Sequence, residues 1–224
     1  MTLSRDSLRS LALALVVALS VFSLGIAEHA YGEAVTLQVV VNSSLTFTSS
    51  TNNFPNITPG TAVFATTTLA TATNNAAGWN VTLYGDDQAT ADTVMDLSTD
   101  AAVGITDQAE WIPGAATTSA GNAVRSGSFD SSGDVLAFRV MAASGSTPFR
   151  AGTWWGTTDN YTDTATTLWA GISSSTVQRQ IGNAGSGSYS SSTHLNTVLY
   201  YLDVPATQQT GTYTGGLTYT ATAN

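Results

Sequence analysis

The sequence predicts an all-β protein, specifically a β-sandwich of Ig-like or jelly-roll-like type with a loop-rich middle insertion. Residues that favour extended backbone, such as Thr, Val and Tyr, are frequent, and Gly, Asn and Ser mark turns along the chain. Several segments alternate apolar and polar residues with a period of two, which is typical of strands. After residue 34 no segment combines a helical period with capping residues, so helices are not expected there.

The N-terminus predicts a signal-peptide helix over residues 1–34. Two arginines precede an apolar run from Leu11 to Ile26, which is shorter than the roughly 20 apolar residues of a membrane span. Small residues permit cleavage after Ala27 or after Ala34, and an uncleaved anchoring helix is the alternative. We therefore expect an extracellular or cell-surface protein with no membrane insertion after signal removal, whose remainder, 35–224, forms a single domain.

Strand-like alternation clusters at both ends of this predicted domain. The expected strands cover 34–48, 61–73, 78–85, 135–141, 193–207 and 210–224. A hairpin is expected across Asn74 to Gly78, and the last strand is expected to lie beside Val198–Val204. The section from about 85 to 192 is loop-rich, with a low-complexity loop over 182–193.

Charge excludes several classes of function. The formal net charge of −9 argues against nucleic acid, whose phosphates require a basic surface. The chain contains no lysine, which excludes isopeptide cross-links through a lysine amine, and no cysteine. Only 9% of residues are charged. A surface with so few charges suits close self-packing, because few charges lose their hydration on contact.

Two stretches, TNNAAGWNVTLYG and GTYTGGLTYTAT, resemble exported microbial cell-surface β-sandwich proteins. These include WxL-like cell-wall-binding domains and donor-strand-type fibre or envelope-layer subunits. The residues that carry the resemblance are Gly78, Trp79, Val81, Leu83, Gly211, Tyr213, Gly215, Leu217 and Tyr219. A WxL motif has leucine where Val81 stands here. The resemblance implies a non-enzymatic structural or adhesive protein whose partners are further copies of itself or other cell-surface components.

In fibre-forming proteins of this kind, a neighbour's N-terminal strand completes the sheet of a subunit. The candidates for such an exchanged strand are Val35, Leu37, Val39 and Val41, which share one face of the first predicted strand. The alternative is that these side chains fill the core of their own chain, because period-2 patterning does not distinguish the two cores.

Tryptophans in the middle section suggest a second function, that of a secreted carbohydrate-binding module. Trp154 and Trp155, with Trp111, could form a platform on which glycans stack. The alternative is that these rings are core residues, since tryptophan is rarely left exposed and neighbours on a strand point to opposite faces.

Evidence for chemistry is weak in this sequence. Asp86, Asp87 and Asp92 lie in one acidic stretch and are weak Ca²⁺ candidates, with a solvated acidic loop as the alternative. No cofactor is expected. His194 is the only histidine certain to remain after cleavage, and no catalytic residue is predicted.

Four sequons could accept N-linked glycans if the host glycosylates exported proteins. Their asparagines are Asn42, Asn56, Asn80 and Asn160.

Overall fold

The structure, a computed structural model, describes Leu13 and residues 38–50, 53–85, 94–113, 121–129, 135–141, 155, 161–174, 176–184 and 190–224. The chain divides into two compact units, Met1–Val41 and Asn42–Asn224. The described residues of the first unit are Leu13 and 38–41, and their side chains are exposed. The following paragraphs concern the second unit.

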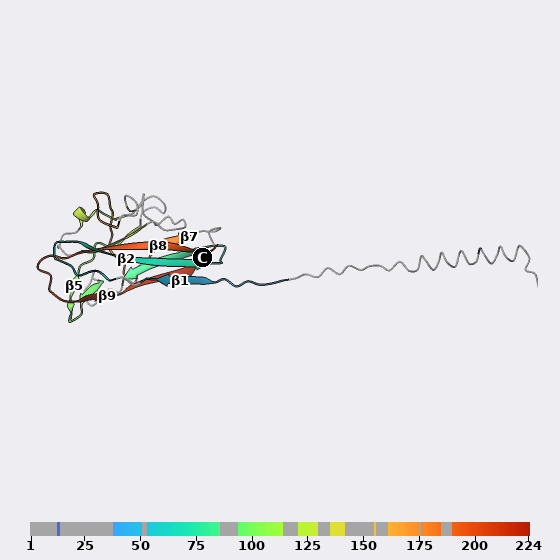
Figure 1. Ribbon diagram of the computed structural model, residues 1–224, viewed down its shortest axis with the longest axis horizontal. Helices are drawn as coiled ribbons and strands as arrows, with labels where there is room; N and C mark the ends of the chain where they lie inside the picture. The colour runs from blue at the N-terminus through green and yellow to red at the C-terminus, as the bar shows by residue number, and fades with distance from the viewer. Residues whose placement is uncertain are drawn as a thin grey trace, which may run out of the picture. The chain divides into compact units, whose positions relative to one another are not determined.

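The second unit is all-β, as the sequence predicts, and its paired strands form antiparallel sheets (Figure 1). Its strands are β1 (Leu45–Ser49), β2 (Val63–Thr73), β3 (Trp79–Gly85), β4 (Met95–Leu97), β5 (Asp100–Ile105), β6 (Val135–Val140), β7 (Arg179–Ala184), β8 (Ser190–Asp203), β9 (Tyr213–Gly215) and β10 (Leu217–Ala223). Sheet A has the order β1-β2-β8-β6, sheet B the order β10-β3-β7, and sheet C the order β5-β4-β9. A short 3-10 turn covers Ser126–Ser128.

Sheets A and B contribute to one hydrophobic core. On β3, Trp79, Val81 and Leu83 are buried and alternate with half-buried polar residues, as the sequence pattern predicts. Alternate residues of β8, beginning at Val198, are buried in the same cluster. These strands therefore hold their registers by period-2 burial, since a shift of one residue would expose the whole apolar set.

Strand β6 is buried on both faces, and this explains its continuous apolar run. Leu136, Phe138 and Val140 belong to the core shared with sheet B. The alternate residues Val135 and Ala137 belong to a second cluster. The middle section supplies part of that second cover through Phe129 and Trp169.

The outer edge of β6 is closed by backbone from elsewhere in the same chain. The amide of Leu136 donates to the carbonyl of Thr106 at 2.9 Å, and its carbonyl accepts from the amide of Gln108 at 2.9 Å. Phe138 exchanges two backbone hydrogen bonds with Ala170, at 2.8 and 3.0 Å. Two short segments thus take the place of a neighbouring strand.

The expected hairpin across Asn74 to Gly78 is wrong. β2 pairs with β1 and β8 in sheet A, whereas β3 pairs with β10 and β7 in sheet B. The turn therefore carries the chain from one sheet to the other. Gly78 makes this change of direction possible, because its φ of 91° is strained for any other residue.

The expected position of the last strand is also wrong. Its residues form two strands, β9 beside β4 in sheet C and β10 beside β3 in sheet B. The predicted neighbour, Val198–Val204, lies largely in β8, whose two edges are already occupied by β2 and β6. No position beside β8 was left for the C-terminal strand.

The first strand is shorter than predicted, because residues 38–44 form no strand and β1 begins at Leu45. β1 begins at Leu45 because its partner strand ends there: Leu45 pairs with Thr73, the last residue of β2. Residues before Leu45 have no residue of β2 opposite them. The predicted loop over 182–193 is also too long, since residues 182–184 belong to β7 and β8 begins at Ser190.

Candidate functional site

An exposed apolar run precedes β1. Val39, Val40 and Val41 are 83%, 75% and 76% exposed. Of the proposed exchange residues, Val35 and Leu37 lie outside the described residues. Three consecutive exposed valines are unfavourable in water and typical of a surface that a partner covers.

Several described strands end a sheet with a partner strand on one side only, and β1 and β10 are two of them. Within the described part of the chain, β1 pairs only with β2, and β10 pairs only with β3. Natural proteins protect such edges with charged residues, proline or bulges. Neither strand contains a charged residue or proline, and neither pairing has a register shift. Both edges are therefore suitable for the addition of another strand.

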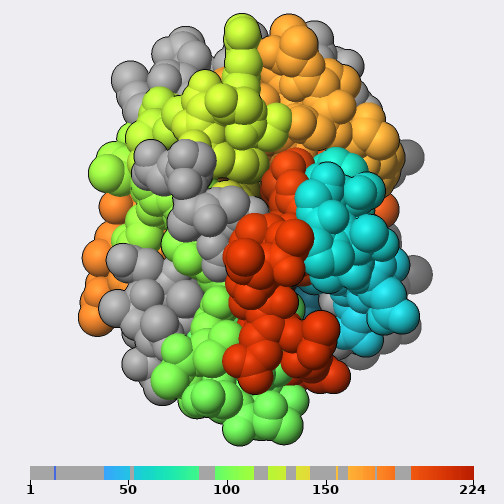
Figure 2. All heavy atoms as spheres, turned by 90° about the vertical axis from the view of Figure 1, so that its left-hand side faces the viewer, coloured from blue at the N-terminus to red at the C-terminus, as the bar shows by residue number. Residues whose placement is uncertain are grey.

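A cavity of about 580 Å³ lies next to the start of β10. Ala65 and Thr67 of β2, with Tyr200 and Leu202 of β8, line it from sheet A. Residues 53–57, residues 211–215 and Leu217 line it too, with Val94 and Met95. None of the residues that line the cavity is charged. Figure 2 looks onto this end of the unit, where the red C-terminal residues lie between the cyan and the green segments.

Glycines bring the backbone close together beside this cavity. A Cβ on Gly215 would lie 1.8 Å from the carbonyl oxygen of Val94, and a Cβ on Gly211 would lie 2.3 Å from Leu97 Cδ1. At Gly215 the contact is with backbone, so only glycine fits there, whereas at Gly211 glycine is favoured by a φ of 156°. Gly215 of the C-terminal pattern is thereby explained by the close approach of this segment to β4.

Two of the three tryptophans of the predicted sugar platform are described, and neither presents its face to solvent. Trp111 and Trp155 are each 0% exposed, and their ring centroids lie 4.9 Å apart. Trp155 also contacts Phe138, with centroids 5.6 Å apart. Trp154 lies outside the described residues. The two described rings therefore serve as core residues in this structure.

The predicted glycosylation sites differ in how accessible their amides are. Asn80 is engaged on β3, since its Nδ2 donates to Asn224 Oδ1 at 2.9 Å and its Oδ1 accepts from Thr222 Oγ1 at 2.8 Å. Asn42 and Asn56 are exposed, and Asn56 lines the cavity. Asn160 lies outside the described residues. A glycan on Asn80 would break the contacts that hold the C-terminal residue.

The three weak Ca²⁺ candidates, Asp86, Asp87 and Asp92, lie outside the described residues. In the part of the chain that is described, no group of three His, Cys, Asp or Glu side chains is placed to hold a metal ion.

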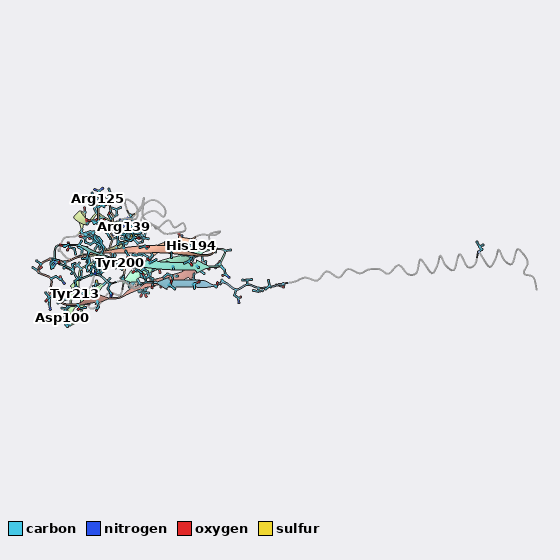
Figure 3. The ribbon with its side chains drawn as sticks, viewed as in Figure 1. Asp100, Arg125, Arg139, His194, Tyr200 and Tyr213 are labelled. Carbon is cyan, nitrogen blue, oxygen red and sulfur yellow. The ribbon has the colours of Figure 1, made fainter. Side chains whose placement is uncertain are left out.

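Polar side chains gather at the end of the core away from the cavity. Thr71 on β2 pairs with His194 on β8, and the ring of His194 lies 5.8 Å from that of Trp79. Figure 3 shows His194 near one end of the long strands and Tyr213 near the other. Asn196 is 1% exposed, and neither its Oδ1 nor its Nδ2 has a hydrogen-bond partner within the described residues. Buried polar groups of this kind reduce stability.

Two tyrosines have raised pKa values. Burial, reinforced by the charges of Asp203 and Asp163, raises the pKa of Tyr201 to about 12. Burial also raises the pKa of Tyr219, although a hydrogen bond with Thr67 lowers it in part. The hydroxyl groups of Tyr219 and Tyr200 are hydrogen-bonded to each other, which ties β10 to sheet A beside the cavity.

Sequence reasoning missed the residues that form the cavity. Phe54 packs edge-on against Tyr200, with ring centroids 6.5 Å apart, and Ile57 packs on the same core. Both lie beside Pro55 in a segment outside the strands that the sequence predicts. The signal that was available is an aromatic and a branched aliphatic side chain in a turn, where polar residues are the rule.

No family model, no curated protein and no solved structure matches this chain. Among the described residues, none lies in a helix with the length and apolar character required to cross a membrane.

Proposed function

We propose that this chain is an exported, non-enzymatic structural subunit of the cell surface that assembles with copies of itself by strand addition. Its predicted signal peptide directs export, and sheets A and B pack as a β-sandwich. The observation that carries the proposal is the exposed run Val39–Val41 directly before β1. An exposed apolar segment with the alternation of a strand is suited to strand addition on a neighbour.

The open edges of β1 and β10 support the same proposal. Strand addition needs backbone N–H and C=O groups that are not already paired, and an edge strand supplies them. Unprotected edges in an exported protein favour association, so their retention is best explained by a neighbour that covers them.

The distribution of charge is a second support. The chain carries a formal net charge of −9, which makes two copies repel each other. Residues 34–50 and β10 nevertheless contain no charged residue. Copies that meet through these segments desolvate no charge on contact. The carbohydrate-binding alternative lacks comparable support, because two of its three tryptophans are buried.

Light scattering coupled to size exclusion tests the proposal on the exported chain. The double variant Val39→Asp/Val41→Asp places two charges in the exposed run and should convert large assemblies into monomers. Ile112→Asp is the matched control, since Ile112 is an exposed apolar residue elsewhere, 57% exposed. It should assemble like the unmodified chain. A monomeric unmodified chain, or a double variant that still assembles, would contradict the proposal.

A further inference from the structure

The cavity beside β10 opens to solvent, since the exposed residues Asn53 and Asn56 line it together with core residues. Its volume of about 580 Å³ falls in the size range of binding pockets, roughly 300–1,000 Å³. Its apolar walls include Leu136, Ile105 and Leu202, each 2–3% exposed. Asn53, Thr67 and Thr212 line it as well, so the lining suits an occupant that has both apolar side chains and polar backbone groups.

The position of the cavity relates it to the open edge of β10. Leu217, the first residue of β10, lines the cavity, and Tyr219 contacts Tyr200 of the opposite wall through its hydroxyl. Leu217, Tyr219 and Ala221 are the side chains by which β10 faces the core. A strand added along β10 would direct its alternate side chains the same way, towards the space between the sheets.

The chain itself supplies an occupant of the right chemistry. Val39 and Val41 are separated by one residue, so on an added strand both would point to the same face, and Val35 and Leu37 continue this pattern in the sequence. Neither the residues around this run nor the lining of the cavity carries a charge. The valines are exposed where they stand and would be buried in the cavity.

We propose that the cavity beside β10 is the acceptor site for the Val39–Val41 run of a second copy of this chain, added as a strand along the free edge of β10. This inference rests on the strand-addition function proposed above, and it specifies which edge receives the strand and which cavity its side chains fill. Residues 53–57, with Phe54 against Tyr200, form one border of the acceptor.

Cysteine cross-linking tests the site directly, because the unmodified chain contains no cysteine. One population of the exported chain carries Val39→Cys or Val41→Cys and a second carries Ala65→Cys. The two are assembled together and oxidised. A disulfide forms only when the two Cα atoms come within about 7 Å. We expect a covalent dimer with Ala65→Cys and none with Ala76→Cys, the same substitution in the exposed turn outside the cavity.

A chain that carries both Val39→Cys and Ala65→Cys separates a neighbour from the chain's own segment. Cross-links between copies give a ladder of covalent multimers on a non-reducing gel. A monomer with an internal disulfide would overturn the proposal, as would equal cross-linking of Ala76→Cys. Light scattering of the same samples distinguishes a failure of the acceptor site from a failure of the strand-addition function. Assembly that depends on Val39 and Val41 but gives no cross-link at Ala65 overturns this acceptor site and leaves strand addition standing.

Filling the cavity is a second test. Ala65→Phe should prevent assembly of a chain that is folded by circular dichroism, whereas Ala76→Phe should assemble normally. Native mass spectrometry of the purified monomer completes the design. A stoichiometric lipid or other small apolar molecule that Ala65→Phe excludes would overturn the proposal in favour of a small-ligand site.

Discussion

The two edges of sheet A, at β6 and at β1, differ in their hydrogen bonding. On the β6 side, backbone at Thr106, Gln108 and Ala170 closes the edge with hydrogen bonds of 2.8–3.0 Å, and both faces of β6 are buried. On the β1 side, no other strand of the described residues pairs beyond β1, and the valines that precede it are exposed. Within the described residues, backbone from the same chain thus closes one side of sheet A and not the other. Under the function proposed above, the open side receives a partner.

Side-chain truncation should show the largest contrast between the two sides. Phe138→Ala, on β6, should lower the free energy of unfolding by about 3–5 kcal/mol, because it leaves a cavity beside Trp111 and Trp155. Val41→Ala should change the stability of the monomer by less than about 0.5 kcal/mol, because this side chain is exposed. Both substitutions are made in a chain that also carries Val39→Asp, which should not assemble. Urea unfolding of the two variants then measures the contrast in monomer stability. Equal losses would mean that Val41 is packed within its own subunit.

The close approach at Gly215 should have the next largest effect. Gly215→Ala forces a methyl group against the carbonyl of Val94 and should cost about 1–3 kcal/mol. Gly127→Ala is the control, since a Cβ at Gly127 meets no atom within 4 Å. Thermal unfolding followed by circular dichroism distinguishes them. If the two substitutions are equally mild, β9 does not lie as close to β4 as described.

Alkaline pH should lower the free energy of unfolding, because Tyr201 on β8 and Tyr219 on β10 have raised pKa values. The pKa of an unfolded tyrosine is about 10, whereas that of folded Tyr201 is about 12, so the folded protein retains the proton when the unfolded chain loses it. The contribution of these tyrosines to stability should be fully present below pH 10 and should fall as the pH rises from there towards pH 12. Urea unfolding between pH 9 and 12 measures the slope, which Tyr201→Phe should reduce. An unchanged slope in that variant would remove Tyr201 as a cause.

The smallest expected change is a gain in stability at the polar end of the core. Asn196→Leu replaces a buried amide that has no described partner and should raise the free energy of unfolding by about 1 kcal/mol. Leu199→Met, on the same strand, is a volume-conserving control. A loss on Asn196→Leu would show that the amide makes favourable contacts in solution.

The faces of the strands could be predicted from the sequence, but their neighbours could not. Alternation at Trp79, Val81 and Leu83 correctly identified a strand with one buried face. Nothing in that alternation distinguishes β10 from β2 as its neighbour, because partner strands with the same period are equivalent in sequence. The expected hairpin failed for this reason.

Of the proposed strand-addition site, only the donor segment could be recognised in the sequence. The run of valines is visible in the sequence, whereas the cavity is formed by residues from Phe54 to Leu217 that long-range folding brings together. The burial of Trp111 and Trp155 could not be predicted from the sequence either, because both rings pack on Phe138, which is distant from Trp111 in the sequence.

Hydrogen exchange of the assembled chain against the Val39→Asp/Val41→Asp monomer tests the central claim most directly. The account predicts that outward-facing amides of β10, Leu217–Ala223, exchange rapidly in the monomer and slowly in the assembly. The amides of Leu136 and Phe138, closed by the chain itself, should be protected in both. Equal protection of β10 in monomer and assembly would contradict the account, because it would show that no neighbour adds to this edge.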